Sequence, residues 1–312
     1  MKCIRSLKEL PAFEKTSVAL GYFDGFHLGH QAVIKKAVER PEKTTVVFSF
    51  TTGEDGKSDK GKNAPRLITL EEKARLCEEM GVDYLVVPPF SDIRGISAED
   101  FVGKILGEEL NAGSISCGFN FRFGKNAEGD GKRLEALCQQ NGIALTQLPP
   151  ISYEGATIST SRIRVDLLEG KIQDVNAMLG RVISYCSEVV HGAKLGRKLG
   201  FPTANEFFAP HQTVPKYGIY AAIVEIGNKR YRGVTSIGVK PTIEGERPPN
   251  METYIRDFSG DIYGEKVRVG LYELLRDEQK FGNIEELKAQ IGRDSEKAQE
   301  MITDKILKET VL

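Results

Sequence analysis

Two histidines three residues apart, His27 and His30, lie in the stretch Gly-Tyr-Phe-Asp-Gly-Phe-His-Leu-Gly-His of residues 21–30. The glycines of this stretch allow a tight turn in which the main chain can approach a ligand closely. An apolar run, residues 18–20, precedes the stretch, and residues 31–40 follow it with the apolar spacing of a helix. Free N–H groups at a helix start and two imidazoles would together bind phosphate, so we expect nucleotidyl transfer.

The two histidines are also compatible with a zinc site or with a purely structural role. Histidines at this spacing can bind zinc, although no cysteine pair or carboxylate lies at metal-site spacing around them. They could equally be partly exposed helix-cap residues without chemistry. The Gly-x-Gly-x-x-Gly and Walker A patterns are absent, which disfavours an ordinary dinucleotide-binding or P-loop fold.

The stretch 21–30 resembles the signature of the bacterial bifunctional riboflavin kinase/FMN adenylyltransferases (FAD synthetases), whose first module belongs to the HxGH nucleotidyltransferase superfamily. The resemblance covers nearly the whole chain. Residues 117–125 (CGFNFRFGK) and 158–164 (ISTSRIR) are similar to further adenylyltransferase blocks. Residues 200–205 (GFPTAN), 238–242 (GVKPT) and 251–255 (METYI) are similar to blocks of the kinase module.

This resemblance implies an enzyme with two activities and two ATP-dependent steps. Riboflavin and ATP would give FMN and ADP in the second module, and FMN and ATP would give FAD and pyrophosphate in the first. Both steps would need Mg²⁺. Two alternatives stay open: a riboflavin kinase with a weakened or inactive adenylyltransferase module, and a non-catalytic flavin- or nucleotide-binding regulator.

One departure from the family pattern motivates the first alternative. Family members usually carry a Phe-x-Pro-His-Pro block after the second strand, and residues 48–54 here read Phe-Ser-Phe-Thr-Thr-Gly-Glu. Both prolines and the histidine are missing. Because the block helps to form the adenylyltransferase pocket, its loss affects flavin or ATP handling there and leaves the kinase untouched.

In the first module, His27 and His30 are the candidate catalytic residues, donating to the phosphates in the transition state. Asp24 would shape the turn and could approach the metal or ribose. The resemblance gives Asn120 a contact with the nucleotide, and Arg162 with Arg164 would close over pyrophosphate. Phe119, Phe121 and Phe123 are expected to support the loop around Asn120. Hydroxyls before a helix are ordinarily N-caps, which is the alternative role of residues 159–161. The expected ATP- and flavin-binding residues are Gly21, Phe23, Asp24, Gly25, Gly29, Asn120, Ser159, Thr160, Ser161, Arg162 and Arg164.

In the second module, Thr203 and Asn205, in an expected Pro-Thr-Ala-Asn turn at 202–205, offer neutral oxygen ligands that suit Mg²⁺ bound also to phosphate and water. Glu252 is the candidate base for the ribityl hydroxyl, although an isolated glutamate at a strand start is usually only solvated. Residues 192–200 combine glycines and cations, as a nucleotide flap or an exposed hairpin loop would. The expected ATP- and flavin-binding residues of the kinase are Gly192, Lys194, Gly200, Phe201 and Pro202.

The pattern of apolar residues predicts an α/β first domain. Strands are expected at 44–50, 82–87, 115–118 and 143–148, with helices at 71–80, 98–110 and 129–140. Such alternation predicts a parallel sheet covered by helices, as in the nucleotidyltransferase-like HxGH superfamily. Residues 51–63, rich in Gly, Lys and Asp, are expected to form a mobile surface loop.

After about residue 180 the pattern changes to strands without crossover helices. Strands are expected at 181–190, 219–226, 231–237, 252–258 and 266–274, with a Gly-Asn hairpin turn at 227–228. This predicts an antiparallel β-barrel with C-terminal helices at 284–291 and 295–312, and the resemblance implies that the barrel is the riboflavin kinase domain. We therefore expect an adenylyltransferase domain at 1–180, including a helical bridge at 162–179, and a kinase domain at 181–312.

Composition agrees with a two-domain enzyme of small molecules. The 312 residues, 40% of them hydrophobic, suffice for two packed cores, and a net charge of −1 predicts no general affinity for nucleic acid or anionic membranes. Five cysteines without a Cys-x-x-Cys pair predict reduced thiols of a cytoplasmic protein, and no stretch is long enough to span a bilayer. We expect riboflavin, FMN and ATP as partners and a monomer or weak homo-oligomer.

Overall fold

The computed structural model describes residues 1–39, 44–51, 65–192, 201–239 and 248–312. These residues form two compact units, Met1–Thr160 and Ser161–Leu312. The sequence predicts a domain boundary at 180/181, whereas the helices of residues 162–179 group with the second unit. Which segments fold as independent domains stays a prediction, and most of the loop expected at 51–63 lies outside the described residues. No described helix has the length and apolar content needed to cross a membrane.

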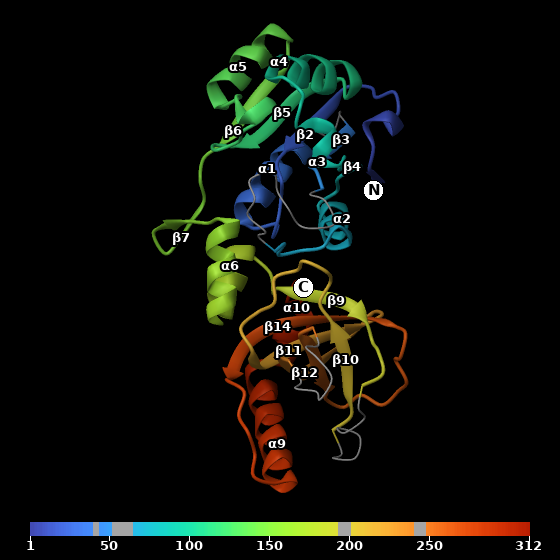
Figure 1. The fold of residues 1–312 in the computed structure, drawn as a ribbon, viewed down its shortest axis with the longest axis vertical. Helices are drawn as coiled ribbons and strands as arrows, with labels where there is room; N and C mark the ends of the chain where they lie inside the picture. Colours follow the sequence, from blue (N-terminus) through green and yellow to red (C-terminus); the bar gives the residue numbers. More distant parts are fainter. Residues whose placement is uncertain (40–43, 52–64, 193–200, 240–247) are drawn as a thin grey trace. The chain divides into compact units, whose positions relative to one another are not determined.

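The first unit contains a six-stranded sheet in which neighbouring strands are parallel, as predicted (Figure 1). The strand order is β1-β4-β3-β2-β5-β6, so the chain continues from β2 to β3 on one side and later places β5 on the other. The strands are β1 (Lys2–Ile4), β2 (Thr16–Leu20), β3 (Thr44–Phe48), β4 (Tyr84–Val86), β5 (Ala112–Gly118) and β6 (Ala144–Leu148). A short hairpin, β7 (Ser152–Tyr153) and β8 (Ala156–Thr157), follows them.

Helices cover both faces of this sheet, as the side chains of β5 demonstrate. Ile115 and Cys117 belong to the hydrophobic core, while the hydroxyl of Ser116 donates to the carbonyl of Val33 in α1 at 2.8 Å. Since successive side chains of a strand point to opposite faces, α1 lies on one face and the large core on the other. The helical segments are η1 (Leu7–Glu9), α1 (Leu28–Val38), α2 (Leu70–Glu79), α3 (Phe90–Ile93), α4 (Ala98–Asp100), η2 (Phe101–Glu109), η3 (Lys125–Ala127) and α5 (Gly131–Gln140).

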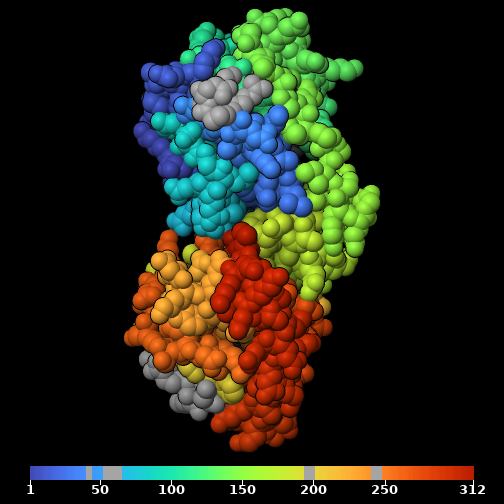
Figure 2. Space-filling model, turned by 180° about the vertical axis from the view of Figure 1, so that it is seen from behind, coloured from blue at the N-terminus to red at the C-terminus, as the bar shows by residue number. Residues whose placement is uncertain are grey.

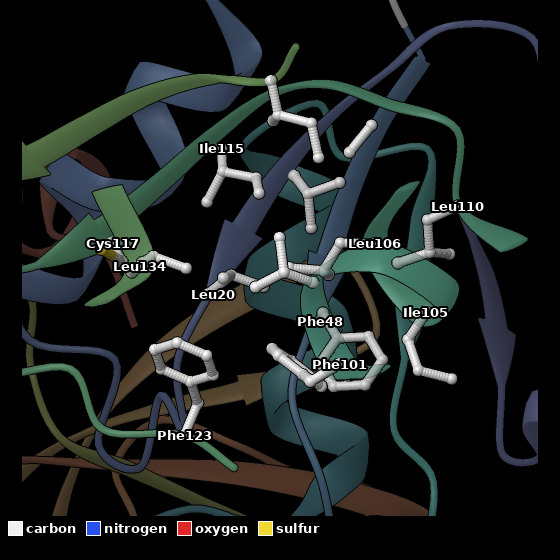
Figure 3. Close-up of a cluster of buried hydrophobic side chains, with 14 of the residues drawn as sticks. Leu20, Phe48, Phe101, Ile105, Leu106, Leu110, Ile115, Cys117, Phe123 and Leu134 are labelled. Carbon is white, nitrogen blue, oxygen red and sulfur yellow. The ribbon is translucent and has the colours of Figure 1, made fainter. Parts of the chain in front are cut away.

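The core of the first unit is mostly aliphatic and includes three phenylalanine rings. Figure 3 shows Phe48, Phe101 and Phe123 with aliphatic side chains from η2 and the sheet. The ring centroid of Phe101 lies 5.5 Å from that of Phe48 and 5.7 Å from that of Phe123. The predicted helix at 98–110 is present, but after α4 it continues as the π-helix η2, whose end is marked by a bond from the N–H of Leu110 to the carbonyl of Ile105.

The second unit is an antiparallel barrel, as predicted. Its strand order is β10-β13-β12-β11-β14-β9, and a bridge between Val190 and Asn205 joins the two ends of the sheet. Gly227, with φ +56°, makes the predicted hairpin turn between β11 and β12. The strands are β9 (Ser184–Glu188), β10 (Thr203–Phe207), β11 (Gly218–Ile226), β12 (Lys229–Gly238), β13 (Asn250–Ile255) and β14 (Lys266–Arg276).

The helices among the described residues of this unit are α6 (Thr160–Glu169), α7 (Ile172–Leu179), α9 (Ile284–Met301) and α10 (Asp304–Glu309). The two C-terminal helices, red in Figure 2, lie against barrel strands. The sequence predicts an interruption between residues 291 and 295, and this is wrong, because α9 runs through it. The helix continues since Asp294 is buried in an ion pair with Arg276, at 2.8 Å, and Ser295 accepts a bond from Arg256.

Candidate active sites

The histidine loop lies where open α/β sheets bind ligands. β3 and β5 lie on either side of β2 and are parallel to it. The chain adds strands first on the β3 side and later on the β5 side, so the strand order reverses between β2 and β5. Ligands bind to such sheets outside the carboxyl ends of the strands, beside the reversal. The loop after β2, residues 21–27, and the loop after β5, residues 119–124, flank this position.

His27 is the N-cap of α1, so the predicted helix start is confirmed. Its Nδ1 accepts a bond from the His30 N–H at 3.3 Å, and the two rings stack with centroids 3.6 Å apart. Because Nδ1 is an acceptor, a neutral His27 carries its proton on Nε2 and can donate from there. Burial and then the charges of His27 and Lys73 lower the pKa of His30 well below its usual 6.5. His30 is therefore neutral at pH 7.

Three glycines of the loop, Gly21, Gly25 and Gly29, are constrained by geometry. Gly25 has φ +78°, a conformation that glycine adopts without strain, and a Cβ on Gly29 would lie 3.1 Å from the His27 ring. Phe23 also has a positive φ, +53°, and its buried ring packs edge-on against His30 with centroids 5.4 Å apart. A Cβ on Gly21 would lie 2.8 Å from the Phe23 ring. Phe23 thus supports the His30 imidazole, while its predicted contact with a substrate stays a prediction.

Asp24 joins three segments of the first unit. Its buried carboxylate accepts bonds from the N–H groups of Leu67 and Ile68 at 2.9 and 3.3 Å. Its carbonyl accepts a bond from the Thr160 hydroxyl at 2.9 Å. Asp24 therefore shapes the loop, as expected, and Thr160 is hydrogen-bonded to the histidine loop. An approach of Asp24 to metal or ribose remains a prediction.

The rest of the block at 158–164 is placed only in part. Arg162 and Arg164 lie in α6, where Arg162 Nε is 3.9 Å from Asp166 Oδ2. Ser159 and Ser161 lie on either side of Thr160 in the chain. The predicted contacts of these two serines and two arginines with ATP remain predictions.

A cavity of about 840 Å³ opens beside the loops of the first unit. Its walls include Phe101, Phe121 and Phe123, and the last two rings stack with centroids 5.8 Å apart. The sequence predicts Phe121 and Phe123 only as supports of their loop, but they also line this cavity. Arg122 and Lys125 add positive charge to the lining. Asn120 is exposed in the turn between β5 and this wall.

Sequence reasoning missed Lys73 of α2. Its buried ammonium donates to the Tyr22 carbonyl at 2.6 Å and to the Ser49 hydroxyl at 3.2 Å, and lies 4.8 Å from the centre of the Tyr22 ring. Burial lowers the pKa of Lys73 from 10.5 to about 8, although the nearby Asp24 carboxylate raises it in part. A lysine in an otherwise polar stretch of helix carries no sequence signal for such burial.

The barrel brings the candidate metal ligands and base together. The sequence predicts Thr203 and Asn205 in a turn, and this is wrong, because both lie in β10. Alternation places them on one face of the strand, and the β10–β13 register sets Asn205 directly opposite Glu252. Such partners have Cβ atoms about 5 Å apart. Asn250, which the sequence did not single out, lies with its Nδ2 3.4 Å from Glu252 Oε1.

Gly192 and Phe201 join the same face. A Cβ on Gly192 would lie 2.5 Å from Nδ2 of Asn205, so the glycine main chain is packed against this amide. The Phe201 ring contacts Tyr254 edge-on, with centroids 5.1 Å apart, and Tyr254 is paired with Thr203. Pro202 is exposed, and Lys194 and Gly200 lie outside the described residues, so their binding roles stay predictions.

Comparison with known sequence families divides the chain in the same way. Residues 10–162 match the FAD synthetase family and residues 179–302 match the riboflavin kinase family. Each match falls on one of the two units, except that the FAD synthetase match extends over residues 161–162 of the second unit.

Known proteins are similar to the chain over most of its length. A bifunctional riboflavin kinase/FMN adenylyltransferase of Bacillus subtilis is 36% identical, with 91% of this chain and 92% of the relative covered. The protein of the same name from Escherichia coli is 33% identical, with 96% of this chain and 97% of the relative covered. A crystal structure described as a macrolide-efflux protein from Streptococcus pneumoniae, 30% identical, superposes with a TM-score of 0.82 over 94% of this chain and 97% of that one. The chain belongs to the bifunctional riboflavin kinase/FMN adenylyltransferase family.

Proposed function

We propose that this chain makes FAD from riboflavin in two steps, phosphorylation to FMN in the second unit and adenylylation of FMN in the first. The observation that carries the proposal is the pairing of Asn205 with Glu252 on one face of the barrel, while His27 and His30 form a separate donor pair in the other unit. Its partners would be riboflavin, FMN and ATP. A cytoplasmic location and a monomer or weak homo-oligomer remain predictions.

In the kinase step, Glu252 accepts the proton of the ribityl hydroxyl as its oxygen attacks the γ-phosphorus of ATP. The bond from the γ-phosphorus to the bridging oxygen breaks, and ADP leaves with that electron pair. Asn250, within 3.4 Å of the Glu252 carboxylate, helps to orient it. Gly192 and Phe201 border the same face and would position the substrates.

The residues on this face fit Mg²⁺. Thr203 and Asn205 supply neutral oxygens, and among the described residues no group of three His, Cys, Asp or Glu side chains could hold a metal ion. This set suits Mg²⁺, which usually binds through few protein ligands and completes its shell with phosphate oxygens and water. Bound there, Mg²⁺ would neutralise charge on the ATP phosphates.

In the adenylyl step, an oxygen of the FMN phosphate attacks the α-phosphorus of ATP, and pyrophosphate leaves with the bridging oxygen. His27 donates from Nε2, because its Nδ1 accepts a bond from the main-chain N–H of His30. His30, neutral because it is buried, carries one further N–H for the same phosphates. Both donors stabilise charge in the transition state, and neither has to transfer a proton.

The aromatic cavity of the first unit is the site that we assign to the isoalloxazine ring of FMN. A volume of about 840 Å³ suits a ligand of this size, and Phe101, Phe121 and Phe123 offer apolar walls. Arg122 and Lys125, also in the lining, favour the negative charge of FMN over neutral riboflavin. The cavity therefore supports FMN as the substrate of this unit.

The test is to incubate purified full chain with riboflavin, ATP and Mg²⁺ and to separate FMN from FAD by chromatography over time. We expect FMN first and FAD next. If the departure from Pro-His-Pro at 48–54 slows the second step, FMN will accumulate ahead of FAD. Residues 52–54 lie outside the described residues. Formation of FMN without any FAD would contradict the proposal.

A further inference from the structure

The segment after β3 contains an aromatic side chain where the family block has proline. Residues 48–51 read Phe-Ser-Phe-Thr, so Phe50 occupies the position of the first proline in Phe-x-Pro-His-Pro. The residue lies between two hollows of the first unit: Phe50 lines both the large aromatic cavity and a small one of about 20 Å³ beside Tyr22, Asp24 and Lys73.

The backbone around Phe50 is held firmly. The N–H of Ser49 donates to Val86, the N–H of Thr51 donates to Pro88 at 3.0 Å, and the N–H of Phe90 donates to Thr51 at 2.8 Å. These bonds on both sides of Phe50 extend the pairing of β3 and β4 beyond the strand ends. The direction of the Phe50 side chain is therefore set by the sheet.

The ring itself belongs to a stack that starts at a buried cation. Lys73 lies 4.8 Å from the centre of the Tyr22 ring, Tyr22 stacks on Phe50 with centroids 4.8 Å apart, and Phe50 lies 4.9 Å from Phe90. The Ser49 hydroxyl and the Lys73 ammonium both donate to the Tyr22 carbonyl, which prevents Tyr22 from moving away. Phe50 thus presents a preorganised aromatic surface to the large cavity.

We propose that Phe50, backed by Tyr22 and Lys73, is a specificity-determining residue of the adenylyl-transfer site that contacts the isoalloxazine ring. This inference rests on the proposed function only in taking FMN as the ligand of the cavity. An aromatic wall favours a planar conjugated ring, and loss of one stacking partner costs about tenfold in affinity. The histidine donors are not in the stack, so the chemical step should be less affected than FMN binding.

The test compares Phe50→Leu, which keeps an apolar side chain without a ring, with Phe50→Tyr, which restores the ring. Phe13→Leu is the matched control, since Phe13 is partly buried in the same unit and packs edge-on against Tyr84, with centroids 5.0 Å apart. We expect Phe50→Leu to raise KM for FMN in FAD formation about tenfold with a smaller change in kcat, and Phe50→Tyr to restore it. Because both changes lie in the first unit, an unchanged circular dichroism spectrum and unfolding midpoint check that this unit is folded in each variant.

A second measurement does not depend on turnover. Titration of the full chain with FMN, followed by quenching of flavin fluorescence, should show a class of site that Phe50→Leu weakens and Phe13→Leu leaves unchanged. If the chain makes no FAD, the proposed function fails, and this titration still tests Phe50. Equal FMN binding by the unaltered chain, Phe50→Leu and Phe13→Leu would overturn the inference.

Discussion

A methyl group added at Gly192 would collide with the amide of Asn205. The added Cβ would lie 2.5 Å from Nδ2 and 2.6 Å from Oδ1, whereas ordinary contacts begin at 3.4 Å. The amide must therefore move by roughly 1 Å, and a misplacement of that size can lower a rate about a hundredfold. Because the amide ends a side chain that can rotate, we expect Gly192→Ala to lower kcat for FMN formation about a hundredfold with little change in Tm.

The assay measures FMN formed from riboflavin and, separately, FAD formed from supplied FMN. The second activity is an internal control, because its site lies in the other unit. Gly292→Ala is the matched variant, since a Cβ there meets nothing within 4 Å, and its kinase rate should be unchanged. A normal kinase rate in Gly192→Ala, beside a strong loss in Asn205→Ala, would refute the reasoning that the position of this amide limits the reaction.

Three further predictions test both units. Glu252→Gln keeps the shape of the side chain and removes the base, so FMN formation should fall by about two to four orders of magnitude while ATP binding, measured by calorimetry, barely changes. The double change His27→Ala and His30→Ala should abolish FAD formation from FMN while riboflavin phosphorylation continues; an equal loss of both activities would show a shared site. Below pH 8 both folded and unfolded chains carry the Lys73 proton and the cost of its burial is fully present, whereas between pH 8 and 10.5 the folded state alone releases it. The free energy of unfolding of the first unit should therefore rise with pH by up to about 3 kcal/mol relative to Lys73→Met. An equal difference in unfolding free energy between the unaltered chain and Lys73→Met at pH 8 and at pH 10 would contradict this.

The spacing of apolar residues along the sequence was sufficient to predict both architectures, because each helix or strand with a clear apolar periodicity was found. β1 and β10 were missed for physical reasons. β1 is three residues long, with its first two exposed, and so shows no alternation. In β10, the residues Thr203, Asn205 and Glu206 are polar although the strand is largely buried, so the pattern of an ordinary strand is absent. The strand exists because its backbone pairs with β13.

The sequence predicted which short blocks of residues form the candidate sites, but not which residues from different blocks contact one another. The approach of His27 to His30 follows from their spacing at a helix start, which is local information. The pairing of Asn205 with Glu252 depends on the register of two strands far apart in the sequence. Lys73 lies in a stretch of α2 whose composition suggests exposure, and only the tertiary fold supplies the Tyr22 carbonyl that holds it.

The kinase face depends on the register of β10 more than on any single contact. Asn205 faces Glu252, while its neighbour Glu206 points to the opposite face with the fully buried Met251. A slip of one residue would exchange the two, because side chains alternate along a strand. It would place a carboxylate in the proposed metal site and an amide in the interior. Burial raises the pKa of Glu206 to about 8, so this interior favours the neutral carboxyl. The five paired positions of β10 and β13, together with the bridge from Val190 to Asn205, hold the register and so keep the neutral Asn205 amide beside Glu252.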